Sequence, residues 1–106
     1  MGNINMMNDI QEEIFWSAKE ESGLWEVINV LVALKKVDRQ TAFELLQSEI
    51  DFINSNAEIY FIYSKKLYDS KTEIVLDKMR IKDLSLHDVE FHEQGPFYYL
   101  SNMPGI

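Results

Sequence analysis

The chain contains no cysteine, and its 106 residues include only two prolines and four glycines. The absence of cysteine excludes disulfide bonds and thiolate metal ligands, so an apolar core must hold the fold together. The glycines stand at positions 2, 23, 95 and 105, too far apart to form a glycine-rich phosphate loop, and there is no G-x-S-x-G nucleophile motif. Phosphate-loop and serine-nucleophile chemistry are therefore not expected.

Long apolar runs are also missing. The longest, residues 30–34 and 59–63, are far shorter than the roughly 20 residues that cross a membrane. The opening residues Met-Gly-Asn-Ile-Asn-Met-Met lack the basic and apolar regions of a secretory signal, and Met6 stands where a myristoylation signal has Ser or Thr. These features predict a soluble, cytoplasmic protein.

Basic residues are outnumbered by acids, 10 to 18, which gives a net charge of -8. Most of the excess lies at the two ends of the chain: residues 1–26 contain six acids but only one basic residue, Lys19. A field of this sign repels nucleic acid and anionic lipid and speeds encounter with a basic partner. We therefore expect no direct binding to nucleic acid or membrane, although Lys65, Lys66 and Lys71 form a local basic patch. Solubility alone would also explain the excess of acids.

The length of the chain and its apolar content of 46% predict a single domain over residues 1–106. The apolar spacing predicts an α+β fold with three N-terminal helices followed by a small antiparallel β-sheet. Asn8 and Gln11 are spaced as a capping box before a first helix over residues 9–20. Asp38 is placed to cap a third helix that extends to residue 53.

The second predicted helix, from Leu24 to Lys36, is apolar over much of its surface. Its stripe of Leu24, Val27, Ile28, Leu31 and Leu34 is broadened by neighbouring apolar side chains that include Val30. This pattern predicts a position in the middle of the core. A homodimer contact through the same helix would explain the pattern equally well.

The second half of the chain changes to strand patterns. Residues 59–63 are all β-branched or aromatic, which is typical of an interior strand covered on both faces. Residues 72–76 predict a second strand, with a continuation through Met79 and Ile81 if alternation persists or a helical turn if it does not. Ser85 can cap a short turn that ends at Glu90, and residues 97–100 predict the last strand.

His87 and His92 are the only clustered side chains suited to metal binding, with Asp88, Glu90 and Glu93 nearby. Their spacing fits one half of a zinc site, but the sequence offers no second pair of ligands. We therefore expect a polar loop with no bound metal or other cofactor.

Catalysis is not expected either. Glu12 and Glu13 are adjacent in sequence, as are Glu20 and Glu21, so the two members of each pair point to different parts of a helix surface. No acid lies within an apolar stripe as a desolvated catalytic carboxyl would, and Glu49 comes nearest. The sequence thus predicts a protein that is not an enzyme and has no catalytic residues.

Aromatic side chains are plentiful at 12% of the chain, more than one small core can easily enclose. Trp16 lies off the stripe of Ile10, Ile14 and Ala18, so it either packs on a neighbouring helix or is exposed among acids. Exposed Trp and Tyr are common in protein-binding surfaces. The predicted partner-binding residues are Glu12, Glu13, Trp16, Glu20, Glu21, Asp88 and Glu90.

The order of the elements is similar to the winged-helix layout, in which three helices support a small β wing. A DNA-reading winged helix would need Lys and Arg on its third helix, whereas residues 38–54 contain only Arg39 against four acids. The acidic, cysteine-free single domain also resembles bacterial immunity proteins, which neutralise a toxin by covering it. That resemblance implies an inhibitor that binds another protein.

These features predict an immunity protein or antitoxin that blocks a basic toxin, such as a nuclease, by imitating phosphate charge. The alternative is a regulatory winged-helix-like module that binds nucleic acid or a small ligand. A salt-dependent shift with duplex DNA would favour the alternative.

The histidine cluster gives a first testable prediction. A structural metal would stabilise the fold, so a chelator would lower the melting temperature of a metal-bound protein. We expect the same melting temperature with and without a chelator, measured by circular dichroism. A fall upon chelation would contradict the assignment of residues 87–93 as a metal-free loop.

Overall fold

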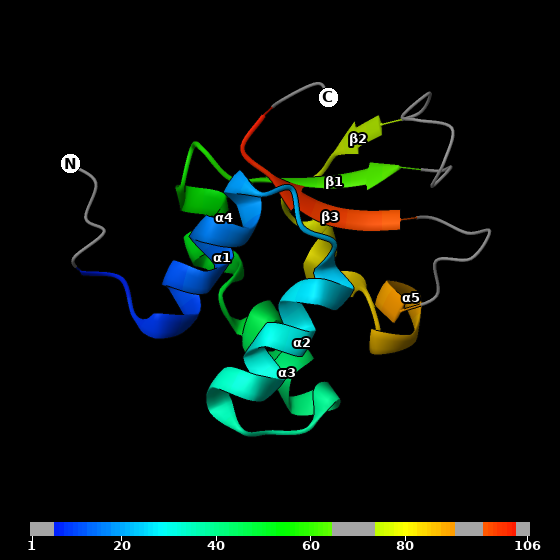
Figure 1. The fold of residues 1–106 in the computed structure, drawn as a ribbon. Coiled ribbons are helices and arrows are strands. Elements are labelled where there is room, and N and C mark those ends of the chain that lie inside the picture. The colour runs from blue at the N-terminus through cyan, green and yellow to red at the C-terminus, as the bar shows by residue number, and fades with distance from the viewer. Residues whose placement is uncertain (1–5, 65–73, 91–96, 104–106) are drawn as a thin grey trace.

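The computed structural model describes residues 6–64, 74–90 and 97–103 and confirms the predicted α+β class (Figure 1). Four helices precede the strands, instead of the three that were predicted. The helices are α1 (Asp9–Lys19), α2 (Leu24–Lys35), α3 (Arg39–Ser48), α4 (Ile50–Ser55) and α5 (Leu86–Glu90), with a 3-10 helix η2 (Arg80–Asp83). The strands are β1 (Tyr60–Ser64), β2 (Ile74–Leu76) and β3 (Phe97–Ser101).

Both predicted helix starts are confirmed. The Asn8 side chain accepts a hydrogen bond from the Gln11 backbone, and the Gln11 side chain accepts one from the Asn8 backbone, which completes the capping box of α1. The Asp38 side chain accepts from the Thr41 backbone N–H at 2.7 Å at the start of α3. These side chains satisfy backbone donors that the first turn of a helix leaves unpaired.

The prediction of one helix up to residue 53 is wrong, because the chain turns at Glu49 between α3 and α4. The hydroxyl of Ser48 donates to the carbonyl oxygen of Leu45 at 2.7 Å and so competes with the helical hydrogen bonds at this point. The turn lets Leu46 of α3 and Ile53 of α4 both lie fully buried.

The sheet is antiparallel with the strand order β2-β1-β3, so β1 is the interior strand, as predicted. Phe61 and Ile62 point to opposite faces of β1, and both are fully buried. The connector between α1 and α2 runs along the outer edge of β3: the Leu100 N–H donates to the Ser22 carbonyl oxygen, and Gly23 forms a β-bridge with Tyr99. This connector therefore covers part of an edge that would otherwise expose unpaired backbone groups.

The extension of the second strand through Met79 and Ile81 is wrong, and the helical alternative describes this stretch. The Asp77 carboxylate accepts from the Met79 backbone N–H at 3.1 Å, and the Arg80 N–H donates to the Asp77 carbonyl oxygen. Asp favours such turns because its side chain bonds to the backbone two residues on. The turn leads into η2, and the following turn begins at Ser85, as predicted.

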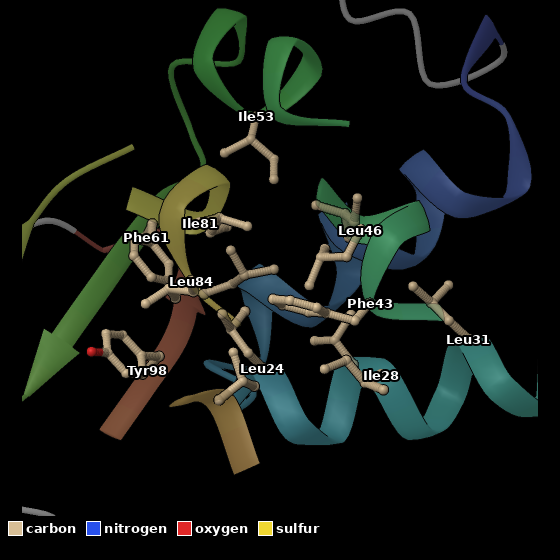
Figure 2. Close-up of a cluster of buried hydrophobic side chains, with 14 of the residues drawn as sticks. Leu24, Ile28, Leu31, Phe43, Leu46, Ile53, Phe61, Ile81, Leu84 and Tyr98 are labelled. Atoms are coloured by element: carbon tan, nitrogen blue, oxygen red, sulfur yellow. The ribbon is translucent and has the colours of Figure 1, made fainter. Parts of the chain in front are cut away.

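The core lies between the helices and one face of the sheet (Figure 2). Leu24, Ile28 and Leu31 of α2 meet Phe43 and Leu46 of α3 in this layer. The two strands β1 and β3 contribute Phe61 and Tyr98, whose rings stack with centroids 5.7 Å apart. Burial of these side chains provides the main force that holds the two halves of the chain together.

The prediction that α2 lies in the middle of the core is correct for only one face of the helix. Leu24, Val27, Ile28 and Leu31 are buried, whereas Val30 and Leu34 are 41% and 44% exposed. The α3 helix and the sheet cover one face of α2, and single apolar side chains outside a core are common on protein surfaces. None of the helices in the described part of the chain has the length and apolarity needed to cross a membrane.

The close packing of the α1–α2 connector predicts that Gly23→Ala destabilises the protein. An added Cβ would lie 2.8 Å from Trp25 Nε1 and 3.2 Å from Phe97 Cζ, so the rings would have to move. We expect a loss of about 1–3 kcal/mol in the free energy of unfolding, measured with urea. Ser22→Ala on the same connector adds no atoms and is the control. Equal stability of the two variants would contradict the close packing at Gly23.

Candidate functional site

The exposed face of α1 is centred on Trp16, whose side chain is 50% exposed. The inner face of the helix buries Ile10, Ile14, Ser17 and Ala18 in or beside the core. Positions three and four residues away on a helix are surface neighbours, and for Trp16 these positions are Glu12, Glu13, Lys19 and Glu20. The periodicity of the helix thus surrounds one exposed indole with three acids and one lysine.

The Trp16 ring is held by two neighbours from its own helix. Phe15 packs edge-on against it, with ring centroids 5.5 Å apart and an interplanar angle of 81°. The Lys19 ammonium lies 5.5 Å from the Trp16 centroid and 5.4 Å from that of Phe15. A cation at this distance is attracted to the negative face of an aromatic ring. The predicted set of partner-binding residues did not include Phe15 and Lys19, although residues four positions apart on a helix are neighbours, which indicates that the two side chains can meet.

The acids of α1 differ in whether their carboxylates are already in use. Glu13 accepts from the Ser17 hydroxyl at 3.3 Å and is half-buried. Glu12 and Glu20 are exposed, and within the described ranges their carboxylates have no hydrogen-bond or ion-pair partner. These two acids lie on either side of Trp16 and are free to meet a partner.

Glu21 follows α1 and is half-buried, with a left-handed backbone conformation at φ 55°. It lies close enough to Tyr99 to affect that residue. Burial raises the pKa of the Tyr99 hydroxyl above its ordinary value, and the negative charge of Glu21 raises it further. Glu21 therefore lies in the α1–α2 connector, beside Tyr99 of β3.

Asp88 and Glu90 lie apart from the other predicted residues, on α5, which flanks α2 on the side opposite α1 (Figure 1). The Asp88 carboxylate accepts from the backbone N–H and the hydroxyl of Ser85, each at 2.8 Å. Glu90 forms an ion pair with Arg39, which also donates to Asn29. The fold does not bring these two acids together with Trp16, and both take part in local contacts.

Two contacts fix α1 on the body of the protein. At its N-terminal end, Asp9 forms an ion pair with Lys35 of α2, with 3.1 Å between the atoms. Glu49, which came nearest to a buried acid in the sequence, accepts from Gln11 Nε2 at 2.9 Å. Asp9 lies two turns before Trp16 along the same helix, and Gln11 points away from it, so both contacts position α1 while leaving the surroundings of Trp16 accessible.

Basic side chains of the described residues are largely engaged elsewhere. Lys78 donates to the carbonyl oxygen of Asn56 and lies 5.0 Å from the Tyr60 ring centroid. Arg80 lies over the Tyr63 ring at 5.8 Å. Arg39, the one basic residue of α3, bonds to Glu90 and Asn29. A DNA-reading role for α3 therefore lacks available cations. The basic patch of Lys65, Lys66 and Lys71 lies outside the described residues.

Other predicted features give no second site. In the described ranges, no group of three or more His, Asp or Glu side chains is arranged to hold a metal ion, and His92 and Glu93 lie outside those ranges. Of the aromatic residues weighed for exposure, Tyr98 and Tyr99 are buried, and Trp25, Tyr60 and Tyr63 are half-buried. Tyr68 is outside the described residues. Trp16 is therefore the exposed aromatic among those that the structure describes.

Comparison of the chain with protein-family models, with curated proteins and with solved structures finds no match. The class that the fold defines is an acidic α+β domain with an exposed aromatic and acidic helix face. Its function has to be inferred from the chemistry of that face.

The contacts of Asp88 predict a pH-dependent contribution to stability. Hydrogen bonds from the Ser85 backbone and hydroxyl hold the pKa of Asp88 below its ordinary value. A carboxyl whose pKa is lower in the folded state stabilises the protein above its unfolded pKa of about 4, and this contribution is lost as the pH falls through the folded pKa. We expect Asp88→Asn to reduce the free energy of unfolding at pH 7 only slightly, by well under about 1 kcal/mol, because Asp88 is exposed and water screens its charge. The difference from the unmodified protein should shrink below pH 4. A constant difference between pH 7 and pH 3 would contradict this assignment.

Proposed function

We propose that this protein binds and blocks a basic protein, as an inhibitor of the immunity or antitoxin kind. The observation that carries the proposal is the half-exposed Trp16. Glu12 and Glu20 lie one turn away on either side, and neither is paired with another of the described residues. At the centre of a protein–protein interface, an aromatic side chain commonly becomes buried when the partner binds and is surrounded by polar contacts. The α1 face supplies both parts from one rigid helix.

The sign of the charge supports a basic partner. The net charge of -8 attracts a cationic protein over a distance set by the ionic strength, and the acids of α1 concentrate that attraction at the proposed contact. A toxin that acts on nucleic acid, such as a nuclease, presents cations that normally meet phosphates. Carboxylates on α1 would occupy those cations and so prevent the toxin from binding its substrate.

An inhibitor of this kind acts by occupying a surface and does not change covalent bonds. It would meet its target in the cytoplasm, because a chain without cysteine has no disulfide bond that would need an oxidising compartment. The resemblance to bacterial immunity proteins leads to a simple genetic expectation, namely that the product of an adjacent gene arrests growth.

Co-expression tests the proposal. We expect this chain to rescue growth when it is expressed together with the toxic product of the neighbouring gene, and to form a stable complex with it. Trp16→Ala removes the anchor and should weaken the complex by about 30-fold or more, measured by calorimetry, with loss of rescue. No rescue by the unmodified chain, or no basic partner, would discard the proposal.

Two double variants distinguish the effect of the acids on the α1 face from the effect of the net charge of the protein. Glu12→Gln with Glu20→Gln removes two charges beside Trp16, whereas Glu44→Gln with Asp83→Asn removes two charges from exposed sites on α3 and η2. We expect the first pair to slow association and weaken the complex, and the second pair to have a much smaller effect. Equal effects of the two pairs would show that overall charge, and not the α1 face, attracts the partner.

A further inference from the structure

We infer that the Trp16 ring binds an arginine of the partner, and that Lys19 occupies the same position in the free protein. This inference rests on the proposed function and specifies the partner chemistry at its centre. The Lys19 ammonium already lies over the rings of Trp16 and Phe15, at 5.5 and 5.4 Å from their centroids. The chain therefore carries a cation of its own where a basic partner would place one.

Lys19 contacts the two aromatic rings and does not form an ion pair with the neighbouring acids in the described residues. Glu20 is adjacent to Lys19, and Glu12 and Glu13 lie within two turns of it, yet none of them forms an ion pair with it in the portion of the chain that the structure describes. The carboxylates of Glu12 and Glu20 consequently stay unpaired beside a ring that already holds a cation. A partner cation that satisfies the ring and a carboxylate together would gain both contacts.

Arginine fits this position better than lysine. Its planar guanidinium can stack on the indole face while its N–H groups fork toward a carboxylate, as Glu12 and Glu20 offer on either side of Trp16. A lysine ammonium is more strongly hydrated and makes a single point contact, so it gains less from leaving water. The edge-on packing of Phe15 supports the indole from one side, which reduces the cost of ordering it when the partner binds.

If a partner arginine takes this position, Lys19 must move away first. Lys19 is exposed at the end of α1, so it can swing into solvent without disturbing the core. Its displacement lowers the affinity by the strength of one exposed cation–π contact, which corresponds to about two- to fivefold in the dissociation constant. Lys19 thus competes with any partner cation for the face of the Trp16 ring.

The test uses two labelled peptides of equal length, decaarginine and decalysine, and measures binding by fluorescence anisotropy at two salt concentrations. The indole N–H signal of Trp16 is followed in parallel by NMR and is assigned with Trp16→Phe. We expect decaarginine to bind more tightly than decalysine and to shift the Trp16 signal. Lys19→Met, which removes the charge and shortens the side chain by one atom, should tighten decaarginine binding by about two- to fivefold.

Two control variants distinguish the removal of Lys19 from the Trp16 ring from the simple loss of a positive charge. Lys36→Met removes an equal charge from an exposed lysine at the end of α2 that forms no ion pair among the described residues, and should have little effect. The gain from Lys19→Met should disappear in a Trp16→Leu background, because the indole for which Lys19 and the partner arginine compete has been removed. Circular dichroism checks that each variant folds, which is expected because all three positions are exposed.

The outcomes distinguish this inference from the proposed function. Equal binding of both peptides, or an equal gain from Lys19→Met with and without Trp16, would overturn the inference and leave the inhibitor proposal to the rescue experiment. Binding of neither peptide to the unmodified protein would overturn the inference and also count against a basic partner.

Discussion

The apolar layer between α2 and the inner face of the sheet connects the two halves of the chain. Leu24, Ile28 and Leu31 of α2 belong to the same buried cluster as Phe61 from β1 and Tyr98 from β3, and α3 adds Phe43. Without disulfides, this burial must offset the conformational entropy that folding removes. Once the layer forms, α1 can bury only its inner face, which leaves Trp16 on the outside.

The α1–α2 connector, residues 20–23, attaches α1 to the edge of the sheet. Ser22 and Gly23 pair with β3, and Gly23 leaves room for the Trp25 and Phe97 rings on either side. The Asp9–Lys35 ion pair and the contact of Gln11 with Glu49 hold α1 at other points. An exposed ion pair contributes little stability, but together with the Gln11–Glu49 hydrogen bond and the paired connector it fixes the orientation of a helix whose outer face is the proposed interface.

The proposed interface depends on which acids are already paired. Asp88 and Glu90 hold α5 through Ser85 and Arg39, whereas Glu12 and Glu20 remain unpaired in the described structure. Sequence reasoning placed all four in one predicted set, because charge alone does not distinguish an acid that caps a helix from one that faces solvent. The separation of α1 from α5 by α2 divides that set into a structural part and an available part.

Local rules predicted the elements that short-range chemistry determines. Asn8 and Asp38 cap their helices, the run predicted over residues 59–63 forms the interior strand β1 at Tyr60–Ser64, and Ser85 directly precedes the last short helix of the described residues. The rules failed where a side chain competes with the backbone, as Ser48 does before Glu49 and as Asp77 does after β2. They also did not predict which apolar residues of α2 stay exposed, because that depends on the area that α3 and the sheet can cover.

The sequence by itself determined the fold class, the helix starts, the acidic charge and the position of Trp16 off the apolar stripe, since each depends on residues within a few positions of one another. Only the tertiary structure decided that Trp16 is exposed, that Lys19 lies over its ring, and that Asp88 and Glu90 serve the fold. The exposure of Trp16 and the ion pair of Glu90 with Arg39 depend on the packing of segments distant in sequence. The contacts of Lys19 and Asp88 are with residues three or four positions away, but they depend on side-chain rotamers, which a linear pattern does not contain.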